Sequence, residues 1–405
     1  MRRYVYYYLL VFFAVSCSFR AYAVEYYFKR ISIEQGLSHA TVNTILRDNR
    51  GMLWVGTRQG LNRIDRSGIK KYFDPTSDGK IRQESNVFHL FEDEYHNLWA
   101  ITDRGLFLYL RDQDTFVSKV SQHVQSVCAI EGGVLFGGYS AIYFYDYKTE
   151  SIVRLPLYRK NTLPEGDYSI IYLQPIDSRR ILVGTENNGI FIYSMDDASF
   201  KLLIATGDTP LSSLFKDNES GDIYFSVFQK GLYRYTRSGK LLKHEDTSNS
   251  GLSNNIVLDI KKYHGRLWLA TDGGGISILD TKTNNITTIK HIPGAVYSLP
   301  VNSIKTLYED SKGNLWAGTV RDGLFLLKEA YIRTYGDVTL GSSNGLSERV
   351  VISLFEDAVG KLWIGTDGGG LNRFDPKTET FTHYLDTYND KIVSITDFVG
   401  TSLLV

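Results

Sequence analysis

Histidine and cysteine are the residue types whose spacing could indicate metal or nucleophile chemistry in this chain of 405 residues. The eight histidines are scattered and form neither an HExxH motif nor a His-x-His pair, so the sequence predicts no zinc site. The two cysteines, Cys17 and Cys128, show no cysteine–histidine arrangement for nucleophilic catalysis. We therefore expect no metal, no cofactor and no catalytic residue.

Two Asp-Gly-Gly-Gly segments, at residues 272–275 and 367–370, could suggest a phosphate-binding loop. Each segment joins two predicted strands and does not open a helix, whereas the phosphate-cradling geometry uses the N-terminus of a helix. We interpret both segments as turns between strands. The sequence has no G-x-S-x-G elbow either, and we expect that the chain is not an enzyme.

The elements that would position any site come from a repeated unit, which ends in a Trp-containing strand, a glycine-rich turn and another strand. The clearest copies are residues 48–65, 310–327 and 357–375, and degenerate copies begin near Leu98, Val134, Ile181, Ile223 and Leu267. The Trp position recurs at intervals of roughly 36 to 48 residues, close to the length of a four-stranded propeller blade. The 36 glycines, 8 prolines and 13% aromatic residues also favour strands with tight turns.

The last complete unit shows how four strands fit into one repeat. Residues 350–355 alternate as an inner strand, and 357–360 form a hairpin turn whose glycine accepts a positive φ. Second, third and outer strands are predicted at 362–366, 371–375 and 381–384. A single four-stranded sheet would leave both faces wet, so the units must stack and close radially, with the recurring Trp packed between blades.

The pattern D-x-x-G-x-L-W-x-G-T-x-x-G-L-x-R, with G-L-S before the inner strand, resembles the two-component regulator propeller repeat. This repeat is characteristic of the periplasmic region of hybrid two-component sensors in Bacteroides-like bacteria, and the resemblance covers nearly all of the chain after its N-terminus. The third and fifth units depart from the pattern, because they lose the Trp and the Gly-Thr pair. Those two blades are predicted from spacing more than from motif.

The Gly-Leu-Ser element occurs at residues 36–38, 251–253 and 345–347, and seven units separate the first copy from the third. We therefore predict an all-β fold with one seven-bladed β-propeller of four-stranded blades at residues 28–333, closed by an N-terminal strand at 26–33. Residues 334–405 are then the first blade and part of the second blade of a second, incomplete β-propeller, with an inner strand at 392–396. This prediction treats the chain as truncated, and a single ring of eight or nine blades is the alternative.

The first 23 residues are predicted to be a secretory signal peptide. Arg2 and Arg3 precede an apolar run at residues 5–15, and Ala21-Tyr22-Ala23 is a small-x-small cleavage signal. The alternative is an uncleaved anchor, although the run is shorter than a membrane span. Cys17 lies in a poor version of a lipoprotein acceptor site, and no later stretch could span a membrane. We expect the mature chain in the periplasm, with Cys128 as its single cysteine and no disulfide.

The 45 basic and 45 acidic residues cancel, so the sequence shows no electrostatic footprint for nucleic acid. In a propeller, the loops leading into the inner strands and the turns between the second and third strands converge on one face, which we predict as the ligand site. Tyr139 and Phe228, aromatic where other blades are polar, could stack on a sugar ring. The predicted ligand-binding residues are Arg58, Gln59, Asp103, Arg104, Tyr139, Glu186, Asn187, Phe228, Gln229, Lys230, Asp272, Arg321, Asp322, His39 and Asn86.

The resemblance implies a non-catalytic sensing module that recognises a glycan-derived oligosaccharide and biases a downstream kinase, within a full-length receptor that is membrane-anchored and homodimeric. The kinase of that family is absent from these residues. Residues 310–316 also resemble the Asp-box turn of sialidase-type propellers, where the element is again a structural turn. Paired carboxylates for glycoside hydrolysis could lie anywhere on a propeller face. A secreted propeller glycoside hydrolase or lyase is therefore the alternative function.

Overall fold

The computed structural model describes residues 26–72, 85–159, 168–293, 298–329, 345–376, 378, 380–384, 390–398 and 402–404. The described residues fall into two compact units, the first reaching Glu329 and the second covering residues from 345 onward. The predicted signal peptide, with Cys17, lies outside the described residues. In the part of the chain that is described, no helix has the length and apolar character needed to cross a membrane.

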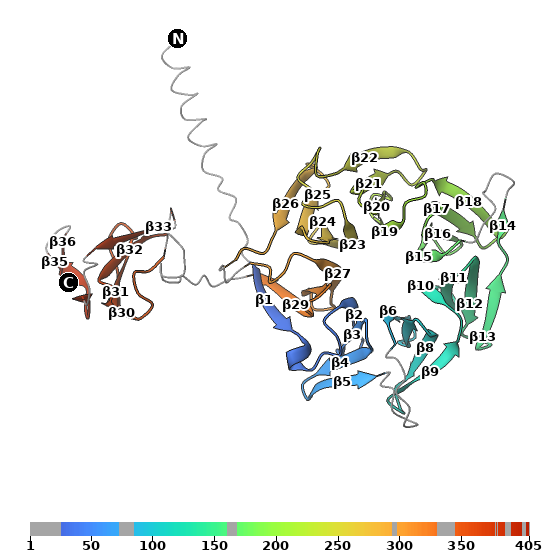
Figure 1. Cartoon of the computed structure of the whole chain (residues 1–405), viewed down its shortest axis with the longest axis horizontal. Helices are drawn as coiled ribbons and strands as arrows, with labels where there is room; N and C mark the ends of the chain where they lie inside the picture. Colours follow the sequence, from blue (N-terminus) through green and yellow to red (C-terminus); the bar gives the residue numbers. More distant parts are fainter. Residues whose placement is uncertain are drawn as a thin grey trace, which may run out of the picture. The chain divides into compact units, whose positions relative to one another are not determined.

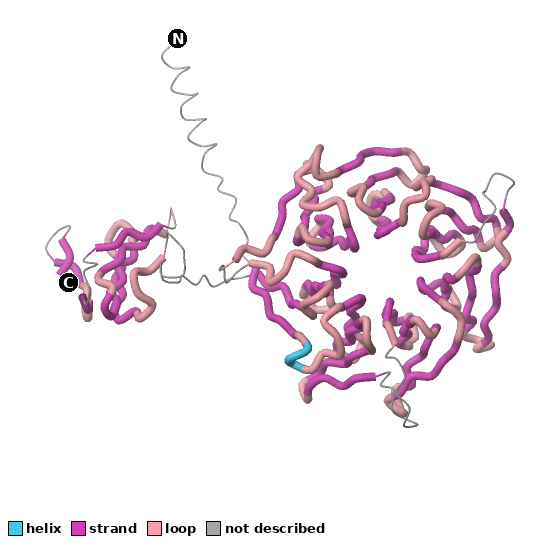
Figure 2. The backbone as a smooth tube through the Cα atoms, viewed as in Figure 1, coloured by secondary structure: helices cyan, strands magenta, loops and turns pink. Residues whose placement is uncertain are grey.

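The first unit consists of seven antiparallel sheets arranged radially (Figure 1). In blades 1 to 6 the four main strands run in chain order from the innermost to the outermost, and the tube in Figure 2 shows strands joined by loops and turns. Blades 1 to 3 contain β2 (Val42–Arg47), β3 (Leu53–Thr57), β4 (Leu61–Asp65), β5 (Gly68–Tyr72), β6 (Val87–Glu92), β7 (Leu98–Thr102), β8 (Gly105–Leu110), β9 (Thr115–Val120), β10 (Val124–Ile130), β11 (Gly133–Gly138), β12 (Ala141–Asp146) and β13 (Ser151–Leu155).

Blades 4 to 6 follow the same order, blade 4 gains the short β14 in parallel beside its outer strand, and the last three strands of this series belong to blade 7. Their strands are β14 (Tyr158–Arg159), β15 (Ile170–Pro175), β16 (Arg180–Thr185), β17 (Ile190–Ser194), β18 (Ser199–Ile204), β19 (Leu211–Lys216), β20 (Ile223–Val227), β21 (Leu232–Tyr235), β22 (Leu241–Glu245), β23 (Val257–Tyr263), β24 (Arg266–Thr271), β25 (Gly275–Asp280), β26 (Asn285–Ile289), β27 (Ile304–Glu309), β28 (Leu315–Thr319) and β29 (Leu324–Glu329).

The ring closes through its first strand. β1 (Tyr26–Ile31) pairs antiparallel with β29 and becomes the outer strand of blade 7, so the predicted closure is confirmed. The strand ends at Ile31 rather than at residue 33 because Ser32 begins a 3-10 turn, η1 (Ile33–Gln35). The Ser32 side chain accepts from the backbone of Glu34, and the Gln35 side chain accepts from the Ser32 N–H, so both ends of this capping box are satisfied.

Close contact between blades explains the glycine of the W-x-G-T motif. A Cβ atom on Gly56 would lie 2.7 Å from a methyl group of Val87 on the next inner strand. At the ring closure, a Cβ on Gly318 would lie 2.6 Å from a methyl group of Val42. Since real Cβ atoms do not approach so closely, only a residue without a side chain lets the next blade seat at these positions.

The second unit contains one sheet of the same strand order, β30 (Val351–Glu356), β31 (Leu362–Gly368), β32 (Leu371–Asp375) and β33 (Thr380–Tyr384). These strands match the predicted ones to within about two residues. The inner strand predicted at 392–396 is not formed as one strand. Instead β34 (Asp390–Lys391) extends the edge of β31, residues 392–395 lie outside strands, and β35 (Thr396–Phe398) pairs only with β36 (Ser402–Leu404).

Candidate functional site

The aspartate of each well-matched repeat has a structural role. It opens the turn between the first two strands of its blade, and one carboxylate oxygen accepts a hydrogen bond from the indole Nε1 of the repeat tryptophan. The four pairs, with N–O distances of 3.0, 2.8, 2.9 and 2.9 Å, are Asp48–Trp54, Asp93–Trp99, Asp310–Trp316 and Asp357–Trp363. Three of these tryptophans are fully or almost fully buried between blades, and Trp54 packs against Leu98 and Tyr109 of the next blade.

The turns between second and third strands are held to the neighbouring blade by backbone hydrogen bonds. The Arg58 N–H donates to Thr41 of its own blade, and the Gly60 N–H donates to Ser85 of the next blade. At the ring closure Gly323 donates to Ala40 in the same way. The face on which these turns lie therefore has a fixed backbone, from which side chains of different blades project.

The predicted ligand-binding residues all lie on this turn face or in the loops leading into the inner strands, and most are exposed. The exposed residues are Arg58, Gln59, Asp103, Arg104, Tyr139, Glu186, Asn187, Phe228, Gln229, Lys230 and Arg321. The half-buried residues are His39, Asn86, Asp272 and Asp322.

Several of the half-buried residues bond to the protein itself. The His39 ring accepts from the Thr41 N–H, and Asp322 forms an ion pair with Arg30 of β1. The carbonyl oxygen of the Asn86 side chain accepts from Asn43, at 2.7 Å. These side chains hold the loops in place, so they contribute to a ligand site mainly by positioning their neighbours.

Two exposed aromatic rings lie on the turn face, on blades 3 and 5. Tyr139 is 61% exposed and stacks on His123, with ring centroids 5.3 Å apart and planes at 28°. Phe228 is 42% exposed. The turn of blade 4 between them presents the exposed Glu186 and Asn187. The face therefore combines rings that can stack with polar groups that can hydrogen-bond, as saccharide recognition requires.

A lysine that sequence reasoning missed lies beside two of the predicted residues. Lys305 is the extra residue of a β-bulge between Ile304 and Thr306. Burial and the charge of Arg58 lower the pKa of Lys305, whereas Asp272 acts in the opposite direction. Arg58 of blade 1 and Asp272 of blade 6 therefore act electrostatically on Lys305 of blade 7, and the bulge that contains Lys305 leaves no signature in the sequence.

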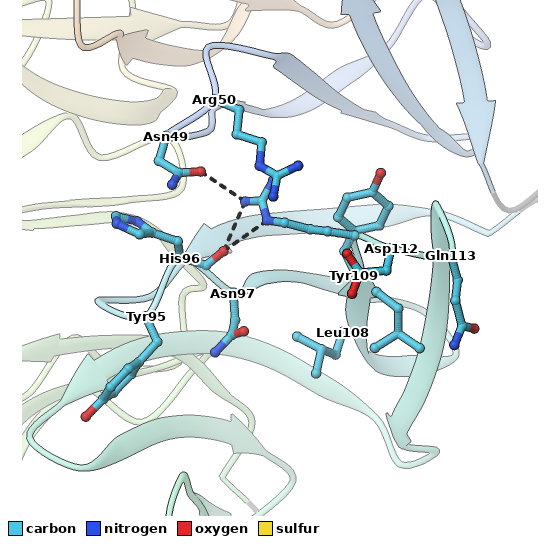
Figure 3. A pocket seen from close by; sticks show the side chains of 11 residues that line it. Asn49, Arg50, Tyr95, His96, Asn97, Leu108, Tyr109, Asp112 and Gln113 are labelled. Atoms are coloured by element: carbon cyan, nitrogen blue, oxygen red, sulfur yellow. Dashed lines mark hydrogen bonds between the residues drawn. The ribbon is translucent and has the colours of Figure 1, made fainter.

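The structure also has a cavity of about 510 Å³ on the other face, which the sequence did not predict (Figure 3). The short strand β7 separates the two faces, because Asn97 precedes it and lines the cavity whereas Asp103 follows it on the turn face. The lining residues are Asn49, Arg50, Tyr95, His96, Asn97, Leu108, Tyr109, Leu110, Arg111, Asp112 and Gln113. They come from the aspartate turns of blades 1 and 2, from the end of β8 and from the turn that follows it.

Metal and thiol chemistry find no support in the described residues. No group of three or more His, Cys, Asp or Glu side chains in this part of the chain could hold a metal ion. Cys128 is buried, and burial raises the pKa of its thiol to about 12. A thiol with so high a pKa is protonated at neutral pH and is a poor nucleophile.

Comparison with known proteins agrees with the fold and the repeat. The sequence pattern of the family described as Two component regulator propeller matches residues 36–59, 298–321 and 345–368. The chain therefore carries copies of this repeat in blade 1, in blade 7 and in the second unit. It is similar to the extracellular domain of a protein from B. thetaiotaomicron described as a hybrid two-component system, with a TM-score of 0.70 and 25% identity over 93% of this chain and 52% of that chain.

A second extracellular domain from B. thetaiotaomicron, described as that of a one-component system, shares the fold with a TM-score of 0.61 and 20% identity, over 93% of this chain and 57% of that chain. Among curated proteins, Histidine kinase P4 of Formosa agariphila is 26% identical over 346 residues, which cover 69% of this chain and 25% of the relative. The chain thus spans about half of the solved domains and a quarter of the kinase that it matches.

Proposed function

We propose that this chain is the non-catalytic, extracytoplasmic sensing propeller of a two-component signalling receptor. The repeat pattern and the similarity to an extracellular domain of a hybrid two-component system support this proposal. The repeat aspartates support it too, because they are engaged by tryptophan and backbone donors and are not free for acid–base work. In this proposal the chain lies in the periplasm after signal-peptide removal, and the full-length receptor is a membrane-anchored homodimer.

The proposed ligand is a glycan-derived oligosaccharide bound on the turn face. The observation that carries this proposal is the exposed ring of Tyr139, which stacks on the half-buried His123, with the exposed Phe228 on the same face. The polar turns of blades 1, 2, 4, 5, 6 and 7 would then select among sugars. Binding shifts a receptor only if the signalling state binds the ligand more tightly, so we expect two arrangements of the dimer.

Calorimetry with oligosaccharides released from pectin, xylan and mucin tests this proposal. We expect binding without cleavage, and Tyr139→Ala and Phe228→Ala should each weaken binding about tenfold, since loss of a stacking ring costs about 1.4 kcal/mol or more. Leu241→Ala, an exposed residue of the outer strand β22, is the matched control and should bind normally. Chromatography that showed shortened oligosaccharides would instead establish the hydrolase or lyase alternative.

A further inference from the structure

The cavity between blades 1 and 2 has a rigid floor made by one arginine. The Arg111 guanidinium donates to Asp48 at 3.1 Å and to Glu92 at 3.0 Å, and it also contacts the side chain of Asn49. Its Nη2 and Nε donate to the backbone carbonyl of His96, at 3.0 and 3.3 Å (Figure 3). Arg111 therefore ties the aspartate turns of two blades together, and its one positive charge is paired with two carboxylates.

His96 has a backbone conformation that the matching turns of other blades give to glycine. It lies at φ 62° in the aspartate turn of blade 2, where Gly51, Gly313 and Gly360 of the matching turns have φ of 82°, 73° and 75°. The turn is otherwise the same, because each of these residues donates its N–H to the carbonyl of the turn's aspartate. A side chain in this left-handed region is strained.

Packing does not offset this strain. The His96 side chain is 62% exposed, and its contact with Glu92 is a marginal one at 4.0 Å. The backbone carbonyl that binds Arg111 would be present in a glycine as well. A strained and exposed imidazole at the edge of a cavity is therefore better explained by a ligand than by stability.

The remaining cavity residues offer unused polar groups of both signs. Within the described residues, the side chains of Arg50, Asp112 and Gln113 take part in no hydrogen bond or ion pair, and all three are exposed. The free guanidinium and the free carboxylate balance each other, so these exposed groups favour neither an anion nor a cation. Asn97 adds a half-buried amide that donates to Asp93 and keeps its oxygen available.

An aromatic ring completes the rim. Tyr95 is 61% exposed and is held at its edge by Tyr147, with centroids 4.6 Å apart and planes at 68°. A fixed ring next to amides, a guanidinium and a carboxylate matches the chemistry of a pyranose, whose hydroxyls both donate and accept and whose C–H face is apolar.

We propose that this cavity is a second saccharide site, which binds a neutral sugar unit through Arg50, His96, Asn97 and Asp112 beside the ring of Tyr95. The ligand class of this site rests on the proposed function, but its residues and its face differ from those of the turn-face site. A long oligosaccharide could not occupy both faces through adjacent sugars, so the two sites bind separate molecules or separate ends.

The test uses the same oligosaccharides and follows the imidazole signal of His96 by NMR in the full chain, assigned through His96→Gln. We expect the oligosaccharides to shift this signal, and Arg50→Ala to weaken the shift-derived affinity about tenfold or more. His96→Gly should abolish binding at this cavity, measured by calorimetry in a Tyr139→Ala background, without lowering the midpoint of thermal unfolding. Glu150→Gly, a similarly strained and exposed residue at φ 49° on blade 3, is the control that leaves binding unchanged.

The experiment can overturn the cavity proposal independently of the turn-face proposal. If the His96 signal stays fixed while Tyr139→Ala abolishes binding, the cavity proposal is overturned and the turn-face proposal stands. A His96 shift that survives Arg50→Ala and disappears in Tyr139→Ala also overturns the cavity proposal, since the imidazole would then report a ligand bound elsewhere. If no oligosaccharide binds at either face, both proposals are overturned.

Discussion

At the scale of single residues, the repeat aspartate gathers donors that would otherwise be buried without an acceptor. Asp310 accepts from the indole of Trp316, from the backbone N–H of Lys312 and Asn314, and from the guanidinium of Arg47 at 2.9 Å. Its own side chain is fully buried. The same geometry recurs at Asp48, where Arg111 takes the place of Arg47.

We expect Asp310→Ala to lower the free energy of unfolding by about 3 kcal/mol, because it leaves a buried indole N–H and an arginine without their acceptor. Urea denaturation of the chain measures this change. Asp112→Ala, at an exposed carboxylate without a partner among the described residues, is the control and should stay within about 0.5 kcal/mol of the parent. Equal losses for the two variants would contradict the structural role of Asp310.

From the environment of Asp310 we also predict that the stability of the fold depends on pH. Burial alone would raise the pKa of Asp310, but the hydrogen bonds from Trp316 and Asn314 outweigh burial and lower it to about 2 from 3.8. A carboxyl with a lowered pKa in the folded state stabilises the fold above its unfolded pKa, and this stability is lost as the pH falls through the folded value. Unfolding free energies measured between pH 5 and pH 2, conditions chosen around these pKa values, should therefore fall less steeply in Asp310→Asn than in the parent.

At the scale of elements, the sequence predicted the strands well because each one carries its own alternation and its own turn residues. It could not predict the β-bulge that interrupts every inner strand of the ring at its second residue. A bulge changes which way the next side chains point, and this is why Lys305 was not among the predicted site residues.

A histidine on the inner strand β6 allows a test of how the protein surrounds the residues next to a bulge. His89 follows the bulge of β6, and its side chain is accessible to solvent. The protein around the imidazole nevertheless desolvates it, and this desolvation lowers the pKa of His89 to about 4 from 6.5. A histidine with a lowered pKa leaves the fold at full stability above pH 6.5, and stability is lost as the pH falls toward 4. Thermal unfolding at pH 7 and pH 5, values chosen around this window, should show a drop that is smaller in His89→Gln.

A second difference between expectation and structure concerns the turn face and the opposite face of the ring, which carries the cavity. The turn face could be predicted because its residues follow a motif within one repeat, and Arg58 and Asp103 lie where that motif places them. The cavity could not be predicted, because it forms where the turn after β8 meets the aspartate turns of two blades. Arg111, for example, bonds to Asp48, which is distant in sequence. The one signal in the sequence was His96 in place of the glycine of the repeat.

At the scale of the whole molecule, the sheet of the second unit has a face that the ring blades bury. The first residue of an inner strand is fully buried in the ring, as Val42 and Val87 show, whereas Val351 is 41% exposed. The fourth residue is 4% exposed at Ile45 but 61% exposed at Leu354. This difference supports the proposal that β30 packs against a further blade of the same repeat in a second propeller.

The exposed apolar side chains of β30 lead us to predict an effect on solubility. A chain of residues 24–333 should remain monomeric at concentrations where residues 24–405 associate, because apolar side chains on an uncovered sheet favour association. Light scattering measures the difference, and Val351→Thr with Leu354→Gln in the longer chain should restore most of it. These substitutions leave the ring untouched, so a longer chain that stays monomeric without them would show that the face of β30 is already covered, and the proposed packing partner would have to be abandoned.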